Sequence, residues 1–206
     1  ILLIGLLNIP VVQNQLTEVV VSELRSKLQT ELSIGKINMG MLNRIIIEDL
    51  NVQDQDQQDL LKVARLSARF DIWELLKGKI SINSVQLFGF DLKLNKQSAD
   101  DRLNMQFIID AFSKPQSDEP TRINLRVNSL LVRRGKLSYD VLDAPTTQGK
   151  FNTSHLQFNN IIANISLKAL QNDSINASIK RLSVTESSGI ELKKLSLKVV
   201  GNRDQM

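Results

Sequence analysis

The sequence predicts a mainly β fold, an elongated and twisted antiparallel sheet with an N-terminal membrane helix and one or two short helices. Three observations predict it: an apolar run opens the chain, the apolar period then changes from about four to two, and runs with a period of two recur up to residue 199. Such alternation is typical of strands with one apolar and one polar face. The length of 206 residues suits one elongated domain or one and a half compact ones.

The apolar run covers residues 1–12 and begins without Met. Twelve helical residues span only about 18 Å, against a hydrocarbon core of roughly 30 Å, so the run could cross a bilayer only with further residues upstream. We interpret it as the C-terminal part of a transmembrane anchor. A cleaved signal peptide and a buried core helix are the alternatives, although no small-x-small cleavage site follows. The anchor residues are Ile1, Leu2, Leu3, Ile4, Leu6, Leu7, Ile9, Val11 and Val12.

After Pro10 the apolar residues Leu16, Val20, Leu24 and Leu28 recur every four positions. This spacing predicts an amphipathic helix over residues 13–31. Such a helix can lie on a membrane surface, but an apolar stripe more often packs on its own domain, and we favour packing.

The remaining chain, residues 32–206, alternates as strands do. We expect a register shift at 83–84 and a β-bulge near Gly89, an amphipathic helix over 104–114, and a turn at Gly189. One helical turn capped by glycine is expected at 73–78, and an exposed loop at 115–120. The expected strands cover residues 44–52, 64–72, 80–94, 123–127, 137–141, 161–167, 175–182 and 195–199.

A weak internal repeat is also present. The segment Ile82-Asn83-Ser84-Val85-x-Leu87-x-Gly89 is similar to Val127-Asn128-Ser129-Leu130-x-Val132-x-x-Gly135. Repetition of this kind favours an extended, stacking β-architecture over a closed barrel, with chance similarity between β-rich segments as the alternative.

Composition argues against several classes of function. Cysteine is absent, so neither disulfides nor thiolate chemistry is available. The net charge is +4 without a dense basic block, and aromatic residues make up only 4%, too few for a base-stacking platform. We therefore expect no nucleic-acid partner. The mild positive charge suits anionic lipid headgroups, and a simply solvated surface explains it equally well.

No catalytic constellation can be assembled. His155 has no second histidine or cysteine with which to share a metal, and we interpret it as structural. The acidic residues Asp54, Asp56 and Asp59 lack the glycine and the terminal glutamate of an EF-hand loop, which indicates a solvated turn. Phosphate-binding glycine loops and nucleophile elbows are absent from the sequence. We expect a non-enzymatic protein without catalytic residues, metal or cofactor.

An ordered series of segments resembles the amino-terminal part of AsmA-like proteins, and most closely the TamB family of the Bacteroidetes type. No single motif is diagnostic, and the resemblance rests on their order along the chain. The segments are Ile9-Pro10-Val11-Val12-Gln13, the helix from Leu16 to Leu28, residues 31–37, 46–54 and 61–72, Leu75-Leu76-Lys77-Gly78-Lys79-Ile80, and residues 134–140 and 186–192.

The resemblance implies a single-pass inner-membrane protein with a periplasmic body shaped as a long β-groove, a β-taco, whose apolar interior is like that of chorein-type lipid bridges. TamB-like proteins work with an Omp85-type outer-membrane partner. They are implicated in phospholipid transport and in outer-membrane protein assembly, a part of protein secretion and outer-membrane biogenesis. Residues 32–206 would then be the membrane-proximal end of the groove.

A groove needs an apolar lining. Exposing an acyl chain to water costs roughly 0.8 kcal/mol per CH₂, so two sixteen-carbon chains cost on the order of 25 kcal/mol. A continuous apolar face removes most of that barrier. The alternative is that the same residues pack together as a sandwich core. The predicted lining residues are Ala64, Leu66, Ala68, Phe70, Ile72, Ile80, Ile82, Phe90, Leu92, Leu94, Leu125, Val127, Leu137, Tyr139, Leu195, Leu197 and Val199.

Three functions remain open from the sequence. The first is a lipid conduit for phospholipid between the inner and outer membranes. The second is a scaffold that assists outer-membrane protein assembly by offering sheet edges to β-proteins or to its Omp85-type partner. The third is an adaptor subunit that binds through exposed loops such as residues 114–120.

Overall fold

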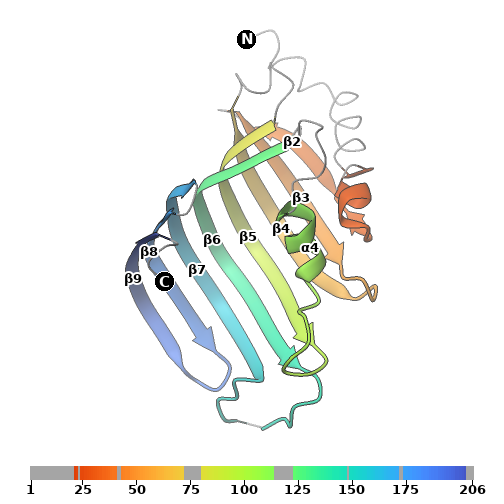
Figure 1. Cartoon of the computed structure of the whole chain (residues 1–206), viewed down its shortest axis with the longest axis vertical. Coiled ribbons are helices and arrows are strands. Elements are labelled where there is room, and N and C mark those ends of the chain that lie inside the picture. Colours follow the sequence, from red (N-terminus) through yellow and green to blue (C-terminus); the bar gives the residue numbers. More distant parts are fainter. Residues whose placement is uncertain are drawn as a thin grey trace.

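The described residues form one open, twisted sheet of nine strands (Figure 1). The computed structural model describes residues 21–22, 24–40, 43–71, 80–113, 123–147, 149–171 and 174–202. The sheet order is β1-β3-β4-β5-β6-β7-β8-β9, with β2 paired to β3 beside β1. The strands are β1 (Leu32–Ser33), β2 (Lys36–Gly40), β3 (Arg44–Gln53), β4 (Asp59–Phe70), β5 (Ile80–Lys96), β6 (Ile123–Val141), β7 (His155–Gln171), β8 (Ser174–Glu186) and β9 (Glu191–Asn202).

The expectation of a mainly β fold is confirmed, but the expectation of a purely antiparallel sheet is wrong. Strands β5 and β6 run parallel, which makes the sheet mixed, and the other strand pairs in the described part of the chain are antiparallel. Parallel neighbours need a crossover of a dozen or more residues, usually with a helix. The chain between β5 and β6 is of that length and contains helix α4 (Gln106–Ser113), which confirms the helix expected at 104–114. The strands expected at 123–127 and 137–141 are one long strand, β6.

The internal repeat corresponds to this parallel pair. In its register Ser84 lies opposite Ser129, and Leu87 lies opposite Val132, which is the alignment that the sequence similarity gives. The two repeated segments therefore lie side by side in one sheet. The predicted register shift is also present, between Ile82 and Ser84.

Four left-handed residues form a line across the sheet, which we call the crease. They are Asp49 in β3, Gly89 in β5, Arg134 in β6 and Asn160 in β7, with φ values of 55°, 64°, 54° and 53°. The strand registers place them at neighbouring positions, and register shifts interrupt the β6–β7 pairing on either side of Gly135. Residues of this conformation are uncommon within strands. The β-bulge expected near Gly89 is wrong, because the β4–β5 and β5–β6 registers run past Gly89 without a shift.

The crease changes which residues share a face. Leu87 and Phe90 are three positions apart in β5, yet both pack against the same core cluster, and so do Val63 and Leu66 in β4. Strict alternation would place residues three apart on opposite faces. Each strand therefore carries two consecutive residues at the crease that point away from the core.

The core lies between the sheet and two helical segments. Leu28, which belongs to the helical residues 24–28, is buried with Leu32, Leu50, Val52 and Val63. Helix α4 packs against the same cluster and lies in front of β4, beside β5 (Figure 1). In the described part of the amphipathic helix expected at 13–31, the apolar residues thus pack on the chain's own sheet. Within the described ranges no helix is long and apolar enough to cross a bilayer; the expected anchor (1–12), helical turn (73–78) and loop (115–120) lie outside them.

Candidate functional site: the apolar face of the sheet

Two uninterrupted rows of apolar residues cross seven strands of the sheet. Each row consists of residues that lie opposite one another from β3 to β9, so the members of a row share one face. The first row contains Ile47, Leu66, Leu87, Val132, Ala163, Leu182 and Leu195. The second contains Ile45, Ala68, Val85, Leu130, Ile165, Ile179 and Leu197.

The length of these rows follows from strand spacing. Neighbouring strands lie about 4.8 Å apart, so a row over seven strands is roughly 29 Å long. Each row runs perpendicular to the strands, in the direction of the hydrogen bonds between them. Neither row contains a charged side chain.

Most of the predicted lining residues lie on this face. Leu66, Ala68, Leu195 and Leu197 belong to the two rows themselves. Further pairs extend the face on both sides of them. These pairs are Phe70 with Ile82, Leu92 with Leu137, Leu94 with Tyr139, and Val199 with Ala177, while Phe90 lies over Gly135.

Of the other five predicted lining residues, the structure describes the side chain of Ala64 alone. Ala64 stands at the crease opposite Gly89, is exposed, and lines a hollow on the other face. Ile72 lies outside the described residues, as do the side chains of Ile80, Leu125 and Val127.

Sequence reasoning missed the row members of β3, Ile45 and Ile47, and those from β5 to β8, of which Leu87, Val132 and Leu182 are examples. A period of two counted back from Phe90 places Leu87 on the opposite face. Gly89 and the repeat were the available signals, because a left-handed residue there breaks the alternation and leaves Leu87 on the side of Phe90.

The two ends of the apolar face differ in how they are covered. Over β3–β5 the helical residues 24–28 and α4 pack on it, and Leu66 belongs to the residues packed against that core. On β9, by contrast, Leu195, Leu197 and Val199 are 36%, 48% and 44% exposed. The face is therefore a helix-covered core at one end and an accessible apolar surface at the other.

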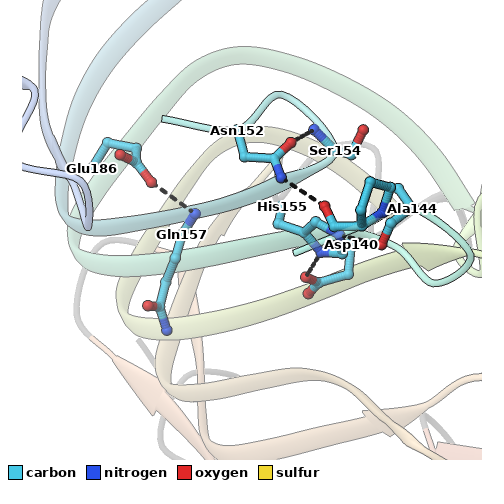
Figure 2. Close-up of polar contacts among 8 residues, drawn as sticks. Asp140, Ala144, Asn152, Ser154, His155, Gln157 and Glu186 are labelled. Carbon is cyan, nitrogen blue, oxygen red and sulfur yellow. Dashed lines mark hydrogen bonds and ion pairs between the residues drawn. The ribbon is translucent and has the colours of Figure 1, made fainter. Parts of the chain in front are cut away.

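A separate polar cluster surrounds the lone histidine (Figure 2). The Nδ1 atom of His155 lies 3.0 Å from a carboxylate oxygen of Asp140, and its Nε2 atom lies 3.0 Å from the carbonyl oxygen of Ala144. Both partners are acceptors, so the protonated ring satisfies both, and the hydrogen bond to Asp140 above all raises the pKa of His155. Because both ring nitrogens are engaged, the histidine fastens the loop after β6 to β7, which is a structural arrangement.

Glu186 likewise holds the turn between β8 and β9 in place through hydrogen bonds. It is 5% exposed, and its carboxylate accepts hydrogen bonds from the Ser188 amide, at 2.7 Å, and from the Ser188 hydroxyl. These bonds lower the pKa of Glu186. Figure 2 shows its second carboxylate oxygen directed at the Gln157 amide of β7.

A solvated turn is expected at residues 54–59, but the first of these residues is buried. Asp54 is 3% exposed, and its Oδ1 atom accepts hydrogen bonds from the backbone amides of Asp56 and Gln58, while Oδ2 accepts one from Asn104. The carboxylate thus closes the β3–β4 hairpin and fastens it to the segment before α4. Within the described ranges, His, Cys, Asp and Glu residues form no group of three that could hold a metal ion.

Comparisons with known proteins add no identity. The chain matches no protein-family model and has no significant match among curated proteins.

Proposed function

We propose that this chain is part of a hydrophobic groove that carries phospholipid between the inner and outer membranes of a bacterial envelope, in the manner of TamB-like proteins. The pair of unbroken apolar rows, roughly 29 Å long across seven strands, is the observation that favours this function. Acyl chains laid along the accessible end of the rows, at β9, would stay out of water, and no chemistry is needed. The opening apolar run would hold the groove against the inner membrane, with the body in the periplasm.

The test uses the open end of the face. Leu66 packs against the core, so a charge there would test folding together with transport. Leu197 is 48% exposed, and an aspartate in its place would remain hydrated when no lipid is bound. A passing acyl chain would have to desolvate that carboxylate, which costs several kcal/mol. Lys198→Asp is the matched control, because Lys198 is an exposed neighbour on the opposite face of the same strand.

The experiment follows labelled phospholipid between the membranes of cells that carry the full-length protein. We expect Leu197→Asp to slow transfer strongly and Lys198→Asp to leave it near the original rate, with both variants equally stable. A photoreactive residue at position 197 should crosslink to phospholipid, and one at 198 should not. Equal transfer rates in the two variants, or crosslinking without preference for position 197, would refute the proposal.

Scaffolding of outer-membrane protein assembly with an Omp85-type partner is the second candidate. Strand β9 favours it, because in the described chain β9 pairs only with β8 and so leaves one backbone edge open. A β-protein could add a strand to that edge. Under this function a proline in β9 would impair outer-membrane protein assembly, and Leu197→Asp would not. Under the lipid-conduit function, by contrast, Leu197→Asp would slow lipid transfer.

A further inference from the structure

A second surface lies on the opposite, polar face of the sheet. There the side chains of β3 to β6 line an open hollow of about 780 Å³. Most of its residues come from the rows next to the apolar ones, because neighbours in a strand point to opposite faces, and Leu87 of the first apolar row also borders it. The lining residues are Arg44, Ile46, Glu48, Asp49, Ala64, Arg65, Ser67, Gln86, Leu87, Phe88, Leu131 and Arg133.

The lining of the hollow includes an exposed aromatic residue between two arginines. Arg65, Phe88 and Arg133 lie directly opposite one another on β4, β5 and β6. Their strands are neighbours, so the Cα atoms of the two arginines are about 10 Å apart. Phe88 is 42% exposed, and the guanidinium of Arg134 lies 5.2 Å from the centre of its ring. Three guanidinium groups are thus placed around one apolar surface.

These cations are not neutralised by ion pairs. In the described ranges none of the ion pairs includes Arg44, Arg65 or Arg133. The lining holds these three arginines against the carboxylates of Glu48 and Asp49, which leaves a formal surplus of one positive charge, and Arg134 adds another beside it. Glu48 stands directly opposite Arg65 across β3 and β4, but the two form no ion pair. Guanidinium groups bind phosphate through paired hydrogen bonds.

We infer that this hollow binds an anionic amphiphile, a phosphate group carried on an apolar body. The guanidinium groups of Arg65 and Arg133 hold the phosphate, and the apolar body lies on Phe88 and Leu131. Free phosphate meets only the first requirement, and an uncharged amphiphile meets only the second. A ligand with both parts should bind much more tightly than either, because burying Phe88 and pairing the arginines then occur in one event.

Calorimetric titration of the full chain with monomeric dodecyl phosphate tests this inference, with inorganic phosphate and dodecyl maltoside as comparison probes. The test variants are Arg65→Gln with Arg133→Gln, and separately Phe88→Ser. The control is Lys194→Gln with Lys198→Gln, which removes the same charge from exposed lysines of β9. All four chains are first compared by their thermal unfolding, so that loss of binding is not confused with loss of fold.

Dodecyl phosphate should bind the parent chain and the lysine control alike. The paired arginine variant should bind it roughly ten- to a hundredfold more weakly, and Phe88→Ser should also bind more weakly. Equal binding of inorganic phosphate, equal binding of dodecyl maltoside, or an affinity that the arginine variant retains would each overturn the inference. The inference does not rest on the proposed lipid groove: Leu197→Asp should leave dodecyl phosphate binding at the hollow unchanged, so the two can fail separately.

Discussion

Gly135 provides the sharpest test of how β5 and β6 pack at the crease. It is buried, and a Cβ atom added there would stand 2.7 Å from Cζ and 2.8 Å from Cδ1 of Phe90, and nearer still to Cε1. The φ angle of Gly135 is not left-handed, so the substitution Gly135→Ala introduces a clash rather than backbone strain. The ring can move only by giving up its contacts with the core cluster. Overpacking of this kind lowers the free energy of unfolding by about 1–3 kcal/mol.

A double-mutant cycle with Phe90→Ala isolates that clash. Phe90 is half-buried, so its removal alone should cost about 2–3 kcal/mol, less than for a fully buried ring. In the Phe90→Ala background, Gly135→Ala should cost almost nothing, because the ring that it strikes is gone. Urea denaturation of the four chains, followed by circular dichroism, gives the coupling energy. Costs that add to within about 0.5 kcal/mol would show that the ring does not lie over Gly135 and would refute the reasoning.

The remaining predictions concern three polar side chains that hold loops and turns in place, those of His155, Glu186 and Asp54. Asp140 raises the folded-state pKa of His155 above 6.5, so the protonated ring stabilises the fold fully below pH 6.5 and this stabilisation is lost as the pH rises through the folded pKa. Thermal unfolding between pH 5 and 9 should show that loss of stability, and the loss should be smaller in His155→Gln. The pKa of Glu186 is lowered below 4.5 by Ser188, so its stabilisation is present above 4.5 and is lost as the pH falls through the folded value. An acid titration of Glu186→Gln should lack that loss, and an unchanged titration would contradict it. Asp54→Ala leaves three donors without their carboxylate and should lower the free energy of unfolding by about 2–4 kcal/mol, measured by urea denaturation, whereas a cost below 1 kcal/mol would mean that water replaces it.

Alternation predicted the strands because a period of two is a local property of the chain. It could not predict that β5 and β6 are parallel, since the direction of a neighbouring strand depends on how the crossover through α4 returns. The repeat carried that information indirectly: two similar segments in parallel register place like residues side by side, as Ser84 and Ser129 show.

The candidate site was predictable only up to the crease. Counting by two from Leu66 toward the N-terminus selects Ala64, whereas the structure continues the apolar face at Val63. The left-handed residues responsible include Arg134, which is neither glycine nor a residue that favours this conformation, so a count by two passes over it.

The crease also explains why the sheet has two distinct surfaces. A bulge lets Val132 and Gly135 share the apolar face, which keeps that face unbroken from β3 to β9 while the strands bend. The two residues between them, Arg133 and Arg134, must then both stand on the polar side, and both are exposed. In β5 the same step leaves Phe88 exposed beside them. The crease therefore produces both a continuous apolar face and, on the opposite face, a group of arginines around the exposed ring of Phe88. Strict alternation would have placed Arg133 and Arg134 on different faces.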